Sequence, residues 1–156
     1  MRYISKQVVF TEVPNEVSLS YMITGCQLKC KWCHSASAWN WEVWTLLTIE
    51  LLEQHLKENE WMITCVLFLW WEWEPLSMIA LLECVRNKGL KTCLYTWMEY
   101  EDMDDRILNY LTYIKTWPYI KELWALTNPK TNQVFMRVDS EEDLTYLFNN
   151  NKEDVE

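Results

Sequence analysis

Short apolar runs of strand length alternate along this chain with segments whose apolar residues recur at helical spacing. Residues 63–69 form a continuous apolar run, which is typical of a parallel strand buried on both faces. The next segment starts at Pro75 and stops at Lys88 and Gly89, residue types that favour the first turn and the end of a helix. We expect strands over residues 18–24, 63–69, 91–96, 113–116 and 133–138, and helices over residues 48–59, 75–88, 104–111 and 140–148.

This alternation predicts an α/β fold. Strand–helix–strand units with right-handed crossovers build a parallel sheet. A complete eight-unit barrel takes about 250 residues, whereas the chain has 156. We therefore expect an incomplete, TIM-like βα barrel of parallel strands. It would form a single domain over residues 1–150, followed by a disordered acidic tail over residues 151–156.

The charge and hydropathy of the chain argue against two classes of partner. The net charge is −9, and a general nucleic-acid binder needs a basic face for the phosphates. The most apolar stretch, residues 62–71, is far too short to span a bilayer, and the first residues lack the apolar core of a secretory signal. We therefore expect a cytoplasmic protein that binds neither nucleic acid nor membrane. In that compartment its 6 cysteines are thiols or metal ligands rather than disulfides.

Cys26, Cys30 and Cys33 form a Cys-x3-Cys-x2-Cys motif directly after the first expected strand. Three thiolates on one tight loop can hold three irons of a [4Fe-4S] cluster, whereas the usual arrangement has four cysteines. The fourth iron is then open to bind a substrate. Zinc is the alternative metal, with a fourth ligand from His34 or a distant cysteine, although the spacing is not the usual zinc-finger pairing. Three buried thiols without a metal are the remaining alternative, and their close spacing argues against it.

The other cysteines and the two histidines carry weaker signals. Cys65, Cys84 and Cys93 fall inside expected strands or a helix, where cysteine behaves as a small hydrophobic residue, so we expect them in the core. His34 directly follows the third motif cysteine and either faces a ligand or lies on a surface loop. His55 is expected to be an ordinary helix residue.

Glycine is scarce and tryptophan abundant. An average composition would give about 11 glycines in this length, but the chain has 2 glycines and 11 tryptophans. Several tryptophans stand at expected turn positions, where a conformationally flexible residue is usual: Trp44, Trp61, Trp97 and Trp117. Backbone positions with positive φ favour glycine for steric reasons, and an indole is the least suitable substitute. The composition suggests that glycine has been written as tryptophan.

The cysteine motif on the loop after the first strand is the signature of the radical S-adenosylmethionine (radical SAM) enzymes. Within them, the chain resembles the small activating proteins of anaerobic ribonucleoside-triphosphate reductase over nearly its whole length. The shared segments include Thr24-Gly25-Cys26, Ser37-Ala38-Trp39, the strand ends Trp70-Trp71-Glu72 and Tyr95-Thr96-Trp97, and Asn132-Gln133. The chain departs from many relatives before the cluster loop, where they have Asn-Gly-Pro-Gly and residues 12–16 read Glu-Val-Pro-Asn-Glu.

The resemblance implies a fold of the radical SAM type and two cofactors, a [4Fe-4S] cluster on the three motif cysteines and S-adenosylmethionine on the open iron. In the family the second strand ends in Gly-Gly-Glu or Gly-Gly-Asp, which holds the methionyl end of S-adenosylmethionine. Glu72 would accordingly meet the ammonium group of that cofactor. The cofactor-binding residues that the resemblance implies are Trp32, His34, Trp70, Trp71, Glu72 and Thr96. No separate acid–base pair is expected, because radical abstraction of hydrogen needs none.

The mismatches with the family run from glycine to tryptophan at positions where glycine has a mechanical role. Our hypothesis is that the codon UGA, read as glycine in some bacterial lineages, has here been translated as tryptophan. It assigns glycine to Trp44, Trp61, Trp70, Trp71, Trp97, Trp117 and Trp124, and less firmly to Trp41. Trp39 matches a tryptophan of the family, and Trp32 stays open between an aromatic residue and glycine. The alternative is an unusual, tryptophan-rich protein.

The implied activity is that of a radical SAM activase, which reductively cleaves S-adenosylmethionine and generates a glycyl radical on the large subunit of anaerobic ribonucleotide reductase. Flavodoxin or ferredoxin would be the one-electron donor. Two alternatives remain: an activator of another glycyl-radical enzyme, such as the formate-lyase type, and a non-catalytic iron–sulfur or zinc-binding module. The short chain favours the reductase activator over the first alternative, because it has no room for an inserted ferredoxin-like domain.

Overall fold

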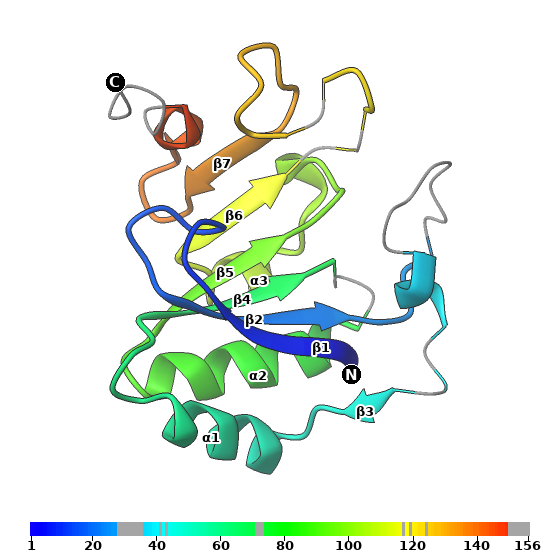
Figure 1. The fold of residues 1–156 in the computed structure, drawn as a ribbon, viewed down its shortest axis with the longest axis vertical. Coiled ribbons are helices and arrows are strands. Elements are labelled where there is room, and N and C mark those ends of the chain that lie inside the picture. Colours follow the sequence, from blue (N-terminus) through cyan, green and yellow to red (C-terminus); the bar gives the residue numbers. More distant parts are fainter. Residues whose placement is uncertain are drawn as a thin grey trace.

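The computed structural model describes residues 1–27, 36–40, 42, 44–70, 74–116, 118, 120–123 and 125–149. Within these residues, one mixed sheet of eight strands has the order β3-β1-β2-β4-β5-β6-β7-β8 (Figure 1). The strands are β1 (Arg2–Val9), β2 (Ser18–Ile23), β3 (Thr45–Leu46), β4 (Cys65–Leu69), β5 (Lys91–Tyr95), β6 (Tyr113–Thr116), β7 (Val134–Arg137) and β8 (Glu142–Asp143). The helices are α1 (Ile49–Glu58), α2 (Pro75–Asn87) and α3 (Asp105–Leu108), with 3-10 turns η1 (Ala36–Trp39), η2 (Tyr100–Asp102) and η3 (Thr145–Phe148).

Four neighbouring strands, β2, β4, β5 and β6, run parallel, and their arrows point to the same side of Figure 1. Met22 pairs with Leu69, Leu69 with Tyr95, and Tyr95 with Lys115. These residues stand at or one residue before the ends of their strands, so the four strands end in one row. We call this side of the sheet the carboxyl edge and the opposite side the amino edge.

The predicted incomplete parallel barrel is wrong. β1 pairs antiparallel with β2, β7 pairs antiparallel with β6, and the two-residue strands β3 and β8 form the sheet edges, so the sheet is open. A parallel neighbour needs a crossover connection, usually a helix. The short helices α1, α2 and α3 precede β4, β5 and β6, but β7 follows β6 without a helix in the described part of that connection. The three crossovers therefore connect four parallel strands, and the next strand, β7, pairs antiparallel.

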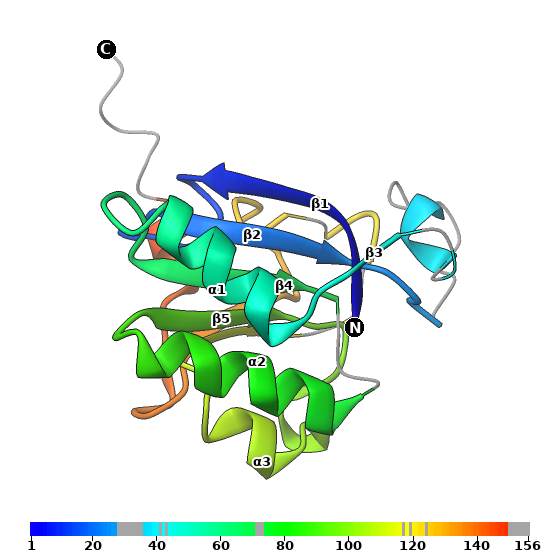
Figure 2. The ribbon, with the colours of Figure 1, turned by 90° about the horizontal axis from the view of Figure 1, so that it is seen from below.

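The sheet has a different apolar cluster on each face. On one face, Leu19, Val66 and Leu94 pack with residues of all three helices, and Figure 2 shows these helices together on the near side of the strands. On the other face, Leu67, Cys93 and Phe135 form a second cluster that includes no residue of α1, α2 or α3. Only the first face therefore has the helical cover that the alternating pattern predicts.

Local signals placed the first two helices correctly. Thr48 is the N-cap of α1, and its hydroxyl oxygen accepts a hydrogen bond from the Leu51 amide at 3.2 Å. Pro75 opens α2, and Gly89 follows its end with φ +75°, a conformation that glycine adopts easily. No described helix has the length and apolar character needed to cross a membrane.

The helix predicted over residues 140–148 is also wrong, because this segment forms β8 and η3. The Asp143 carboxylate accepts a hydrogen bond from the Thr145 amide at 2.8 Å, and the Thr145 hydroxyl accepts one from the Phe135 amide at 2.9 Å. Short polar side chains that bond to the backbone in this way compete with helix formation. β1 lies outside the strands expected from the sequence, and it pairs antiparallel with β2.

His55 lies on α1, as expected, but it is buried and has a specific partner. Its Nδ1 atom is 2.9 Å from the hydroxyl oxygen of Tyr21 on β2. Burial lowers the pKa of His55 and raises that of Tyr21, so the pair is held in its neutral form near pH 7. The Tyr21 ring also stacks on Phe68 with the centroids 5.7 Å apart. This contact joins α1 to two strands of the sheet.

A buried carboxylate joins the parallel strands at the amino edge. Glu16 precedes β2, and its carboxylate accepts hydrogen bonds from the Lys91 ammonium, from the Tyr113 hydroxyl at 3.0 Å and from the Thr64 hydroxyl at 2.7 Å. These three partners stand at the starts of β5, β6 and β4. The hydrogen bond to Glu16 raises the pKa of Lys91. The Glu16 carboxylate is thus paired with three donors, and these contacts hold the starts of four strands together.

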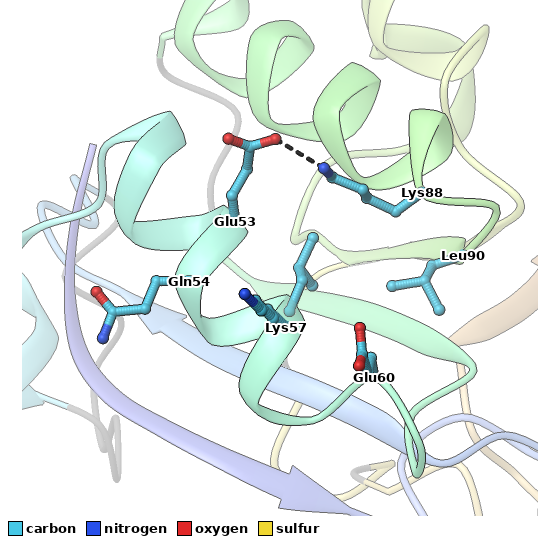
Figure 3. A pocket seen from close by; sticks show the side chains of 7 residues that line it. Glu53, Gln54, Lys57, Glu60, Lys88 and Leu90 are labelled. Atoms are coloured by element: carbon cyan, nitrogen blue, oxygen red, sulfur yellow. Dashed lines mark ion pairs between the residues drawn. The ribbon is translucent and has the colours of Figure 1, made fainter.

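Replacing this carboxylate should destabilise the fold. Glu16→Ala removes three hydrogen bonds to a charged group and should lower the free energy of unfolding by about 2–3 kcal/mol, measured by urea denaturation. Glu53→Ala is the matched control, since its pair with Lys88 at 2.9 Å is about half exposed on both sides (Figure 3). Exposed pairs contribute up to about 1 kcal/mol. Equal losses in the two variants would contradict the role given to Glu16.

Candidate functional site

Two of the predicted cofactor residues meet at the carboxyl edge. Trp70 directly follows β4 and Thr96 directly follows β5. The strand pairing continues into both residues, because the Trp70 amide donates to the Tyr95 carbonyl at 2.8 Å and the Thr96 amide donates to the Lys115 carbonyl at 2.8 Å. In-register parallel strands therefore bring positions 70 and 96 side by side, although 26 residues separate them in the sequence.

Cys26, the first motif cysteine, lies beyond the end of β2 on the same edge. Gly25 precedes it with φ +93°, and the amides of both residues donate to the Ala38 carbonyl, at 2.7 and 3.3 Å. The turn η1 is thereby held against the start of the cysteine loop. The Cys26 side chain is 8% exposed. Cysteine thiolates are ligands of iron–sulfur clusters and of zinc. A Cys26 thiol shielded from solvent, at the start of the loop that carries the cysteine motif, is compatible with either kind of site.

The other predicted site residues lie outside the described part of the chain. These are Cys30, Cys33, Trp32, His34, Trp71 and Glu72. The structure consequently brings together Cys26, Trp70 and Thr96 at one edge and leaves the rest of the site as a prediction. Within the described residues no group of three histidine, cysteine or acidic side chains could hold a metal ion, and the predicted group includes two cysteines outside that range.

The backbone at Trp70 has φ +66°, in the left-handed region that glycine favours. A side chain with a Cβ atom adopts this conformation at a cost of roughly 1–2 kcal/mol. The Trp70 indole stacks on the indole of Trp97, with the centroids 6.1 Å apart and the planes inclined by 17°. The two rings cover the ends of β4 and β5, where the resemblance places the methionyl end of S-adenosylmethionine. The chain as written therefore fits the first cluster ligand but not this cofactor.

Thr96 has a structural contact of its own. The residue is fully buried, and its hydroxyl oxygen accepts a hydrogen bond from the Met98 amide at 3.0 Å. This bond closes the turn that leads from β5 along the carboxyl edge. Thr96 thus shapes the backbone at the candidate site, and its contact with a cofactor stays a prediction.

Cys65, Cys84 and Cys93 are buried, as the sequence predicts. Burial raises the pKa of the Cys65 thiol to about 12 and the pKa of Cys93 well above its usual value, with a smaller upward shift for Cys84. A thiol binds metal as the thiolate. These three side chains are therefore protonated at neutral pH and belong to the core rather than to the candidate site.

Sequence reasoning missed two buried polar residues beside the edge, Lys115 on β6 and Gln133 just before β7. The only signal for Lys115 is its place after Tyr113 and Ile114 in a four-residue strand. The same pattern is compatible with a lysine that points to solvent. The burial of Lys115 follows only from the tertiary structure, in which β6 has a neighbouring strand on each side.

A groove of about 480 Å³ lies at the other side of the molecule, between the ends of α1 and α2 (Figure 3). Lys88 and Leu90 line it from the segment that leads into β5, so the groove belongs to the amino edge. The ion pair of Glu53 with Lys88 spans it. The groove is therefore separate from the strand ends that carry the candidate site.

No protein-family model matches this chain, and no curated protein matches it. The spacing of the cysteines and the geometry of the strand ends are therefore the features of this chain that bear on its function.

The positive φ at position 70 can be tested by comparing glycine with alanine at positions 70 and 97. Trp70→Gly and Trp70→Ala both remove the indole, but only glycine relieves the positive φ, so Trp70→Gly should be the more stable by about 1 kcal/mol in urea denaturation. Trp97 is outside the set of described residues with positive φ. There the order should reverse, with Trp97→Ala more stable than Trp97→Gly by about 0.4–1 kcal/mol. The same order at both positions would contradict the assigned backbone.

Proposed function

We propose that this protein, with glycine at positions 70, 71 and 97, is a radical SAM activase that generates a glycyl radical on the large subunit of anaerobic ribonucleotide reductase. The observation that carries the proposal is that Cys26, Trp70 and Thr96 all follow parallel strands that end at the same edge of the sheet. The proposal does not need a closed barrel, because the site is built from strand ends that already lie in one row.

The chain's own residues would have three tasks in this activity. Cys26, Cys30 and Cys33 would hold the cluster as thiolates and leave one iron free. The Glu72 carboxylate would accept a hydrogen bond from the cofactor ammonium, and a glycine backbone at positions 70 and 71 would let the cofactor approach the sheet. When bound, the [4Fe-4S] cluster supplies one electron for cleavage of S-adenosylmethionine. The sheet edge would exclude water from the reacting groups.

We propose further that UGA encodes glycine in the organism that makes this protein. Two observations support this reading. Trp70 has φ +66°, and Trp61, in the turn after α1, leaves 80% of its surface exposed. Positive φ is a steric reason for glycine, and an indole that is mostly exposed in a turn buries little apolar surface.

The coding DNA and the natural protein test this second proposal directly. We expect UGA codons at positions 70, 71 and 97, and glycine at these positions in peptides of the natural protein analysed by mass spectrometry. A UGG codon is expected at position 39, where the tryptophan matches the family. UGG codons at 70, 71 and 97 would refute the reading.

The activity is tested with two forms of the chain, as written and with Trp70→Gly, Trp71→Gly and Trp97→Gly combined. After reconstitution with iron and sulfide, both should show cluster absorbance, but only the glycine form should bind S-adenosylmethionine and yield 5′-deoxyadenosine with dithionite. Cys26→Ala should lose the cluster, whereas the control Cys84→Ala should keep it, because Cys84 lies in the core. Equal cofactor affinity in the two forms would contradict the role of positions 70 and 71.

The same assay separates the alternatives. A glycine form that assembles a cluster but gives no 5′-deoxyadenosine would be an electron carrier. A zinc module would bind zinc in preference to iron. Electron paramagnetic resonance of mixtures with the large subunit of anaerobic ribonucleotide reductase, or with a formate-lyase-type enzyme, would show on which partner the glycyl radical forms.

A further inference from the structure

Lys115 is a buried cation that has no counter-charge among the described residues. Its side chain is on β6, and the residue is only 5% exposed. The ammonium nitrogen lies 5.0 Å from the ring centroid of Tyr95 and 4.7 Å from that of Trp97. No hydrogen bond or ion pair joins it to another described residue. Burial lowers the pKa of Lys115 to about 8, which is the expected effect of desolvation on an uncompensated amine.

Gln133 provides a second buried donor beside it. The residue is 3% exposed, and its Nε2 atom has no hydrogen-bond partner among the described residues. Lys115 pairs with Phe135 across the antiparallel β6–β7 ladder. Gln133 is two residues before Phe135, so it projects to the same face of the sheet as Lys115, at the diagonal position.

The contrast with the amino edge shows that this arrangement is not a structural ion pair. There Lys91 is matched by the buried carboxylate of Glu16. At the carboxyl edge an ammonium and an amide donor lie on one face without an acceptor among the described residues. Buried donors normally have partners, because an unpaired one carries a desolvation cost. Two donors on one face, one of them charged, match the oxygens of a carboxylate or phosphate group.

We propose that Lys115 and Gln133 form an anion-binding subsite at the carboxyl edge, which takes the carboxylate or phosphate group of a small molecule. The indole of Trp97 lies over the ammonium in the chain as written and closes this subsite. A smaller residue at position 97 opens it to the edge. The inference does not depend on the proposed activity, because it uses no cluster and no motif cysteine.

The test uses the full chain with Trp97→Gly, titrated separately with inorganic phosphate and with acetate and followed by NMR of the lysine side chains. One of the two anions should bind saturably and shift the Lys115 resonance, and the two titrations show whether phosphate or carboxylate is preferred. The chain as written should bind the same anion more weakly. Trp97→Ala repeats the measurement should the glycine variant fold poorly.

Substitutions in the Trp97→Gly chain assign the site. Lys115→Met should weaken binding about tenfold or more, since a hydrogen bond to a charged group is lost, and Gln133→Met should weaken it less. Lys115→Met should keep its fold, because an apolar side chain of similar volume commonly replaces a buried charge without loss of stability. The control Lys57→Met, on α1, should leave the affinity unchanged. Absence of saturable binding of both anions, or equal affinity after Lys115→Met, would overturn the proposal.

Discussion

In-register hydrogen bonding among β2, β4, β5 and β6 is the constraint on which the rest of this structure depends. Because the four strands run parallel and end in one row, residues from four separate stretches of sequence meet at one edge. The same register places the starts of these strands around Glu16 at the opposite edge. A slip of one residue would turn every side chain to the other face of the sheet and disperse both groups.

The two edges differ in how their buried charged groups are paired. At the amino edge the charge of Glu16 is met by an ammonium and two hydroxyls, which makes this cluster a structural clamp. At the carboxyl edge Lys115 and Gln133 are buried, and among the described residues neither the Lys115 ammonium, the Gln133 amide nitrogen nor the Thr116 hydroxyl has a hydrogen-bond partner. Unsatisfied groups next to strand ends are what a binding site needs and what a core avoids. This difference in charge pairing supports our proposal that the functional groups lie at the carboxyl edge.

Backbone conformation at this edge bears on which residues the cell makes there. Gly25 and position 70 follow neighbouring strands, and both have positive φ, but only the first is glycine in the sequence as written. The stacked indoles of Trp70 and Trp97 occupy the ends of β4 and β5 and cap Lys115. Glycine at position 70 would remove backbone strain, and glycine at positions 70 and 97 together would free the strand ends and expose the lysine. The proposed activity and the proposed anion subsite thus both require a small residue in place of tryptophan at the strand ends, although they do not share a mechanism.

The sequence by itself determined the elements whose causes are local. Thr48, Pro75 and Gly89 set the limits of the first two helices, the apolar run of β4 predicted a buried parallel strand, and the position of Cys26 after the first parallel strand followed from the motif. The remaining motif cysteines lie outside the described residues, so their arrangement stays a prediction. The tertiary structure alone decided the directions of β1 and β7, the loss of the helix expected over residues 140–148, and the burial of Lys115 and Gln133. Each of these depends on a neighbouring segment, because strand direction and burial are set by the neighbour with which a segment pairs, and the residues within one segment do not record which neighbour that is.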